Sequence, residues 1–132
     1  MKVYLSKINE SWIIDRMRKE WYEHNSEVST EKINESDIIW IISPWLWKKL
    51  PKRYLKKNKV VCSVYHFEEK DFERDSLKDF YKRDSYVDEY HVISPYIEKD
   101  LRNLTTKPIT YIPFWVNESI WFNIFLLYTS DA

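Results

Sequence analysis

The chain has 132 residues, and its 21 basic and 21 acidic side chains give a formal net charge of zero. Hydrophobic residues make up 44 % of the chain, which argues against a disordered protein. The neutral balance argues against nucleic-acid binding, which needs a basic excess. Cys62 is the one cysteine, and glycine is absent. These two facts exclude an internal disulfide, a multi-thiolate zinc site and the glycine-rich phosphate loops.

The first half of the chain predicts a strand, a helix and a second strand. Val3–Leu5 is a short apolar run, and Ile13, Met17 and Trp21 follow at four-residue spacing on one face of a helix. Residues 28–36 are polar and leave open a short edge strand around Val28 and one helical turn. Residues 37–43 are almost continuously apolar, as in a parallel strand that is buried on both faces.

Two prolines mark the segment after this strand. Pro44 suits the first turn of a helix, whereas Pro51 interrupts the stretch 45–58. We therefore expect two short helices there, or one kinked helix.

The second half continues the alternation of strands and helices. We expect strands over 60–66, 86–93 and 108–112, and helices over 70–84 and 95–104. In the first of these helices, the candidate core contacts are Phe72, Leu77, Phe80 and Tyr81.

This alternation predicts an α/β protein with a Rossmann-like open parallel sheet flanked by helices. In such sheets, ligands bind at the carboxyl ends of the strands. The polar residues that follow the predicted strands are therefore candidate site residues: Asn9, Glu10, Ser11, Ser43, His66 and Ser94.

Four patterns in the same order resemble the amino-terminal domain of GT-B glycosyltransferases of family 4. Residues 36–40 (SDIIW) resemble the strand that begins alanine-Asp in that family, and residues 62–66 (CSVYH) resemble its strand ending in a histidine at the cleft. Residues 88–94 (DEYHVIS) are similar to its strand ending in a serine. Residues 109–117 (ITYIPFWVN) look like its interdomain segment, although Phe114-Trp115 replaces the usual Asn-Gly.

The resemblance implies transfer of a sugar from a nucleotide-activated donor to an acceptor hydroxyl. It assigns a catalytic role to His66 and substrate contacts to Asn9, Glu10, Ser11, Ser43 and Ser94. It implies neither a metal nor a cofactor, because the nucleotide-sugar donor is held mainly by a carboxyl-terminal domain that this chain lacks. The expected partners are a sugar or glycolipid acceptor and that missing donor domain, with no nucleic acid.

The same resemblance divides the chain. Residues 1–112 form the Rossmann-like acceptor-side domain, and residues 113–125 start an interdomain linker. Residues 126–132 resemble translated transposase-adapter sequence, so we expect this tail to be non-native.

Plainer interpretations stand beside each site residue. Ser11 and Ser94 can cap helices instead of binding a ligand, and His66 can be a loop histidine without a role. His91, in the middle of a predicted strand, is interpreted as structural, and His24 is given no function. A non-enzymatic flavodoxin-like binding module is the alternative to the glycosyltransferase.

The segment 45–59 carries seven cations and no acid, interleaved with aromatic residues. This pattern is typical of a surface that contacts anionic lipid, but it also fits a solvated helix with its aromatics in the core. The membrane-contact candidates are Lys48, Lys49, Lys52 and Arg53. We expect a cytoplasmic protein without a signal peptide or a membrane span. If the segment contacts lipid, the expected place is peripheral, at the inner face of the membrane.

Overall fold

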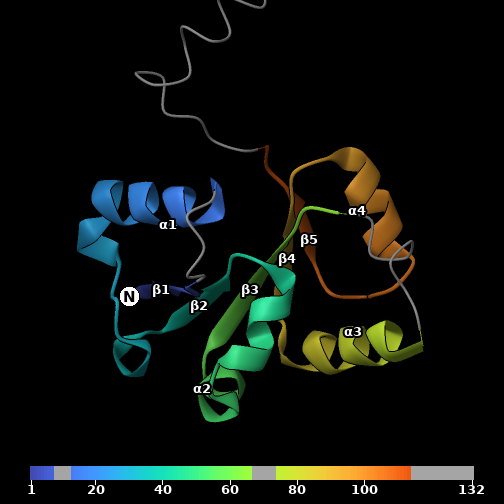
Figure 1. The fold of residues 1–132 in the computed structure, drawn as a ribbon, viewed down its shortest axis with the longest axis horizontal. Helices are drawn as coiled ribbons and strands as arrows, with labels where there is room; N and C mark the ends of the chain where they lie inside the picture. Colours follow the sequence, from blue (N-terminus) through green and yellow to red (C-terminus); the bar gives the residue numbers. More distant parts are fainter. Residues whose placement is uncertain (8–12, 67–73, 114–132) are drawn as a thin grey trace, which may run out of the picture.

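The computed structural model describes residues 1–7, 13–66 and 74–113 (Figure 1). The described part of the chain forms one parallel sheet in the order β1-β2-β3-β4-β5. The strands are β1 (Val3–Leu5), β2 (Ile38–Ile41), β3 (Lys59–Val64), β4 (Glu89–Val92) and β5 (Ile109–Tyr111). All four pairings are parallel, so the predicted α/β architecture with a parallel sheet is confirmed.

Helices connect these strands. They are α1 (Ile13–His24), α2 (Lys52–Lys57), α3 (Arg74–Tyr86) and α4 (Pro95–Arg102), with three short 3₁₀ helices η1 (Ser26–Val28), η2 (Ile33–Glu35) and η3 (Pro44–Lys49). The segment around Pro51 is split into η3 and α2, as one of the two sequence expectations had it. Leu50 between them is extended, with φ −93° and ψ 143°, because a residue before proline is disfavoured in the helical region.

A rudimentary sixth strand lies on the outer side of β1. Ser29 forms a single parallel bridge with Val3, and the Thr30 N–H donates to the Val3 carbonyl at 3.0 Å. The Lys2 carbonyl accepts instead from Ile38 of β2, so β1 lies between Ser29 and β2. For residues 28–36 we expected an edge strand and one helical turn. The structure has a single bridge in place of the strand and short 3₁₀ turns in place of the helical turn.

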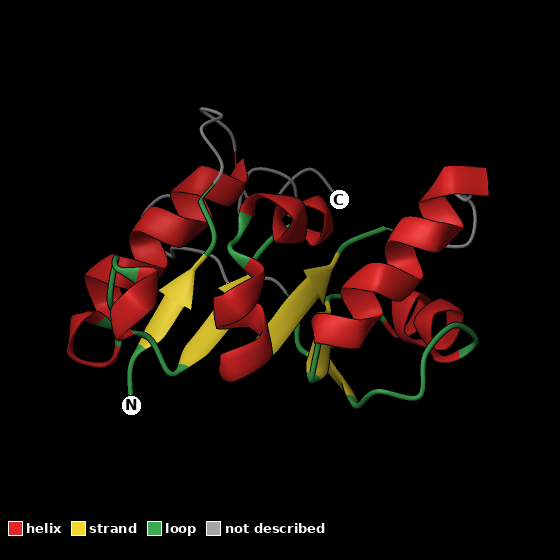
Figure 2. Cartoon of the chain, turned by 90° about the horizontal axis from the view of Figure 1, so that it is seen from below, coloured by secondary structure: helices red, strands yellow, loops and turns green. Residues whose placement is uncertain are grey.

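This bridge reveals where the chain reverses its direction across the sheet. From β1 the chain passes outward through α1 to Ser29, and from there it returns to β2 and continues to β5. Because crossovers are right-handed, such a reversal places α1 on one face of the sheet and the later helices on the other. Figure 1 shows α1 opposite α2 and α3, and Figure 2 shows α2 and α3 in front of the sheet as seen from below.

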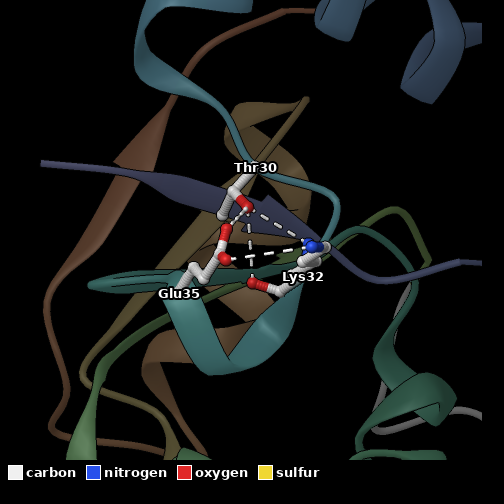
Figure 3. A network of polar contacts seen from close by, with 3 residues as sticks. All are labelled: Thr30, Lys32 and Glu35. Carbon is white, nitrogen blue, oxygen red and sulfur yellow. Dashed lines mark hydrogen bonds and ion pairs between the residues drawn. The ribbon is translucent and has the colours of Figure 1, made fainter.

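The return from Ser29 to β2 is short and is held by local polar contacts (Figure 3). The Thr30 hydroxyl accepts from the Lys32 N–H at 3.1 Å and lies 3.5 Å from the Glu35 carboxylate. The Lys32 ammonium lies 4.0 Å from the same carboxylate. Asp37 then accepts from the Lys2 N–H at 2.8 Å, which sets the register of β1 on β2.

The tyrosine hydroxyl of Tyr22 on α1 extends this outer pairing. It accepts from the Leu5 N–H and donates to the Thr30 carbonyl, at 2.9 Å each. A regular parallel ladder would place a direct bond between these two backbone groups. Burial raises the pKa of Tyr22, which keeps the bridging hydroxyl protonated.

The two faces of the sheet differ in polarity. The face under α2, α3 and α4 is apolar and carries the buried residues Ile39, Ile41, Val60, Cys62, Val64, Tyr90 and Val92. The other face is covered over β1 and β2 by α1, where Trp21 packs edge-on against Trp40 with ring centroids 5.8 Å apart. Farther along, that face carries Lys59, Glu89 and Thr110, which contact one another through Glu89.

Two of the residues of α3 that were expected to contact the core do not do so. Leu77 and Tyr81 are 38 % and 54 % exposed and do not face the core, whereas Phe80 is 2 % exposed. Arg83 takes a core position instead, with its guanidinium 4.9 Å from the centre of the Phe80 ring and 5.4 Å from that of Tyr90. Phe72 lies outside the described residues.

The strand expected over residues 86–93 starts later. Tyr86 is the last residue of α3, and the Val87 N–H bonds to the Arg83 carbonyl at 3.1 Å, as at a helix end. Val87 still reaches the core, with 0 % exposure. Its apolar side chain therefore fits the core without belonging to the strand, which begins at Glu89.

Candidate functional site

The reversal of chain direction creates a switch point between β1 and β2. In open parallel sheets, ligands bind in the crevice beyond the carboxyl ends of the strands at such a point. Ser6 follows β1, and Ser43 follows β2 by two residues, so both lie at this edge. Asn9, Glu10 and Ser11 come next in the chain after β1, but they lie outside the described residues.

Ser6 joins the two strands at the switch point, and sequence reasoning missed it. Its N–H donates to the Trp40 carbonyl at 2.9 Å, and its hydroxyl accepts from the Ile42 N–H at 3.0 Å. Ser6 is 1 % exposed and Ser43 is 5 % exposed. The Ser43 hydroxyl makes no capping bond to η3, although this residue occupies the N-cap position.

Arg18 brings a positive charge to the same end of β1. Its Nε–H donates to the Leu5 carbonyl at 3.2 Å, and its guanidinium stacks over the Tyr22 ring at 4.7 Å. These contacts hold a planar cation beside the switch point, where it suits an anionic group of a ligand. The sequence does not single out Arg18, because its place depends on how α1 crosses β1.

His66 and Ser94 lie farther along the same edge. His66 is exposed and follows the end of β3 by two residues. Ser94 follows β4 and caps α4, since its hydroxyl accepts from the Tyr96 N–H at 3.1 Å. Capping is thus observed for Ser94, and its contact with a substrate stays a prediction. Ser43, His66 and Ser94 follow β2, β3 and β4, which are neighbours in one parallel sheet, so all three residues lie at the same edge.

A hydrogen-bonded chain runs across the α1 side of the sheet just below this edge. The Trp40 indole N–H donates to the Ser63 hydroxyl, which pairs with His91 Nδ1, both at 2.8 Å. His91 Nε2 lies 2.8 Å from the Ile112 carbonyl. The chain therefore links β2, β3, β4 and the residue that follows β5.

The Ile112 carbonyl determines which ring nitrogen of His91 must carry a hydrogen. A carbonyl only accepts, so Nε2 carries a hydrogen and donates to Ile112. Since Ser63 already accepts from the Trp40 indole, the neutral form with a bare Nδ1 lets its hydroxyl donate to His91. His91 is 8 % exposed, in agreement with its interpretation as a structural residue. Tyr65 follows Ser63 by two residues, and burial raises its pKa to about 12.

No family model, no curated protein and no solved structure matched this chain. The function must therefore be argued from the site alone. Among the described residues, no three His, Cys, Asp or Glu side chains converge in a way that could hold a metal ion. The groups at the strand ends are hydroxyls, one imidazole and one guanidinium, which suit a ligand rich in hydrogen-bonding groups.

A pocket of 320 Å³ lies at the opposite edge, between the ends of α2 and α3. Two of its polar residues are already used by the fold. The Asp88 carboxylate accepts from the Val60 N–H at 2.8 Å, and the Asn58 amide donates to the Ser36 hydroxyl at 3.1 Å. The switch-point edge is therefore the better candidate site.

The four membrane-contact candidates differ in their surroundings. Lys48 pairs with Asp79 of α3 at 2.6 Å, Lys49 lies over the Trp45 ring at 5.0 Å, and Arg53 lies over the Tyr54 ring at 4.9 Å. Lys52 points inward and donates to the carbonyls of Trp47 and Leu50 at 2.7 and 3.2 Å. Burial lowers the pKa of Lys52, so its ammonium serves the fold and not the surface.

Proposed function

We propose that this chain is the acceptor-binding half of a glycosyltransferase of the GT-B, family 4 kind. In the whole enzyme, a sugar would pass from a nucleotide-activated donor to a hydroxyl of a sugar or glycolipid acceptor. The observation that supports the proposal is the switch point between β1 and β2, where Ser6, Ser43 and Arg18 lie at the carboxyl ends of the strands. The donor would be held mainly by a second domain, so this chain alone would be inactive.

Each residue at this edge has a role in the proposal. His66, exposed beyond β3, would hydrogen-bond the reacting hydroxyl or the transferred sugar. Ser43 and Ser94 would contact acceptor hydroxyls, together with the loop of Asn9, Glu10 and Ser11. Arg18 would face a negatively charged group of the acceptor or of the donor diphosphate.

Binding to the isolated chain tests the acceptor site. Nuclear magnetic resonance of the ¹⁵N-labelled protein would be followed while methyl glycosides of common hexoses are added. We expect the amides of Ser43, His66 and Ser94 to shift, and those around Asn58 and Asp88 at the other edge to stay unchanged. His66→Ala should weaken the binding severalfold, whereas the matched control His24→Ala, at the exposed end of α1, should not. Shifts at the Asn58 edge alone, or none at all, would contradict the proposal.

The downstream genomic sequence tests whether a donor-binding domain follows this one. Since residues 126–132 are expected to be non-native, the genomic sequence that continues from about codon 125 should encode a second Rossmann-like domain with paired glutamates for the sugar nucleotide. A reading frame that continues into an unrelated domain would exclude the glycosyltransferase.

One observation favours the alternative of a non-enzymatic flavodoxin-like binding module. With Ser29 counted as a strand, the order of the sheet is the 2-1-3-4-5 order of flavodoxin-like folds, extended by one strand. Such a module would bind its ligand completely without a second domain. Saturable binding of a flavin or nucleotide by this chain, with no response to glycosides, would favour it.

A further inference from the structure

The strand β5 forms an open edge of the sheet. It is the last strand in the order β1-β2-β3-β4-β5, and it pairs with β4 on one side (Figure 1). The Ile112 N–H donates to the Val92 carbonyl of β4 at 2.9 Å. Because the backbone groups of successive residues point to opposite sides of a strand, those of Ile109 and Tyr111 point away from β4. In the described part of the chain, these backbone groups have no partner.

β5 lacks the protection that the opposite edge of the sheet has. There, the hydroxyl of Tyr22 accepts from the Leu5 N–H at 2.9 Å. Exposed edges are usually blunted by charges, prolines, bulges or a covering side chain. Residues 109–112 contain no charge and no proline, and Thr110, Tyr111 and Ile112 are exposed. A further strand can therefore add to the sheet at β5.

We propose that β5 pairs antiparallel with β5 of a second copy of this chain, about a two-fold axis at Thr110. The two sheets would join into one continuous sheet. Since Tyr22 closes the opposite edge, this pairing occupies the open edge of both copies, and assembly stops at the dimer. The inference goes beyond the sugar-transfer proposal and does not depend on it.

The backbone of β5 is complementary to itself in this register. With Thr110 opposite its own copy, Ile109 lies opposite Tyr111 of the second copy. Both residues direct their N–H and C=O groups outward, so each such pair exchanges two hydrogen bonds. The two copies of Thr110 form the closer, non-hydrogen-bonded pair between them, and threonine pairs are favourable at such positions.

The side chains and the charge fit the same arrangement. Ile109 packs against the core, whereas Tyr111, which alternation places on the same face of the sheet, is 46 % exposed. In the dimer, the Tyr111 ring would lie beside Ile109 of the second copy, as an aromatic and β-branched cross-strand pair. The chain has a formal net charge of zero, so two copies do not repel each other through their net charge.

Other kinds of partner fit this edge less well. A lipid headgroup layer or a nucleic acid does not match a row of alternating backbone donors and acceptors, whereas a polypeptide strand does. None of the described helices is both long and apolar enough to cross a bilayer. Pro108 and Pro113 bound the row, and Pro113 has no N–H for the next outward position. A long peptide strand would therefore gain few bonds here, and the short symmetric row favours its own copy.

Sedimentation velocity of the full chain over a range of concentrations tests the proposal. We expect an equilibrium between monomer and dimer. Thr110→Lys puts like charges opposite each other at the axis, although each lysine lies next to Glu89 within its own copy. It should raise the Kd of the dimer about fivefold or more. Thr106→Lys makes the same charge change at an exposed residue between α4 and β5 and should leave the Kd within about twofold.

Two further variants test the backbone pairing and its register. Tyr111→Pro removes an outward N–H without affecting the bonds to β4, and it should raise the Kd about tenfold or more. In a non-hydrogen-bonded antiparallel pair, the Cα atoms are about 4.5 Å apart, which a disulfide can span. Oxidation should therefore link two copies of Thr110→Cys but not of Thr106→Cys. Cys62 is 0 % exposed and does not compete.

Four results would overturn the proposal. They are a monomer at every concentration, equal effects of the two lysine variants, equal cross-linking of the two cysteine variants, and no cross-linking of Thr110→Cys. A fifth comes from hydrogen exchange of the dilute monomer, in which the amides of Ile109 and Tyr111 should exchange rapidly. Protection of these amides in the monomer would mean that residues after 113 cover the edge in place of a second copy.

Discussion

Two substitutions of His91 separate the two hydrogen bonds that this residue makes. Asparagine can place its amide oxygen near the position of Nδ1 and accept from Ser63, but it is too short to reach Ile112. Glutamine can place its amide nitrogen near Nε2 and donate to the Ile112 carbonyl, while Ser63 loses its acceptor. The two variants therefore remove different ends of the Trp40–Ser63–His91–Ile112 chain.

The structure sets the size of the effect. Removing one partner of a buried hydrogen bond costs about 1–3 kcal/mol. Ile112 is 54 % exposed, so water can replace the lost donor at its carbonyl, and the cost in His91→Asn should be near 1 kcal/mol. Ser63 is 0 % exposed, so His91→Gln should cost more, about 2 kcal/mol or above. The locations should also differ, with the end of β5 affected by asparagine and the centre of the sheet by glutamine.

Native-state hydrogen exchange reads out this difference. The Ile112 N–H bonds to the Val92 carbonyl at 2.9 Å and reports opening at the end of β5. In His91→Asn, its exchange should accelerate about fivefold relative to the Val60 amide in the core, which follows from about 1 kcal/mol. In His91→Gln, the ratio of the two rates should stay near that of the parent protein. An unchanged ratio in His91→Asn, or a larger change in His91→Gln, would refute the assigned hydrogen-bond directions.

Three other predictions concern stability and are checked by urea unfolding. Leu101→Ala, at a position with 0 % exposure, should cost about 2–5 kcal/mol, while Leu77→Ala, at an exposed site of α3, should cost no more than about 1 kcal/mol. Ser94→Ala should cost about 1 kcal/mol through loss of the α4 cap, and Ser94→Asn should restore most of it. Tyr65 has a pKa raised from 10.0 to about 12 by burial, so its contribution is complete below pH 10 and lost as the pH rises toward 12. Replacement by phenylalanine should remove roughly 1–3 kcal/mol of the fall in stability across that pH window, and an unchanged pH profile would contradict the burial of this hydroxyl.

The strands were predictable because burial on both faces leaves a continuous apolar run. Residues 37–43 and 60–66 both show this pattern. β2 lies within the first range, and β3 begins one residue before the second range and ends inside it. The helix breaks around Pro44 and Pro51 follow from the fixed geometry of proline, so they were equally readable. The carboxyl-edge positions of Ser43, His66 and Ser94 followed directly from the parallel sheet.

The inward face of α3 was not predictable from its pattern. Leu77 and Tyr81 have the spacing of a core stripe, but a buried arginine takes the position between Phe80 and Tyr90. Hydropathy predicts that arginine lies on the surface and that leucine and tyrosine face the core, and α3 has the opposite arrangement. The rings of Phe80 and of Tyr90, which belongs to a strand, make the position favourable for a cation.

The parts of the candidate site contributed by Ser6 and Arg18 were missed for a related reason. Each depends on a contact between segments far apart in the chain: Ser6 with Ile42, and Arg18 with Leu5. Sequence spacing sets neighbours along one element, whereas the register of β1 on β2 is set by pairing across the fold. The switch point itself was hidden, because its outer strand is reduced to one bridge at Ser29.

The phenol group of Tyr22 has a consequence for how the protein avoids self-association. A sheet margin with free backbone groups is a template on which another polypeptide can add a strand. Here a side chain from α1 satisfies the next N–H of that margin and the carbonyl that would have bonded to it. At this edge of the sheet, a side chain from a helix therefore satisfies backbone groups that a longer outer strand would otherwise pair. Loss of that single oxygen, as in Tyr22→Phe, would leave both backbone groups open to a neighbouring chain.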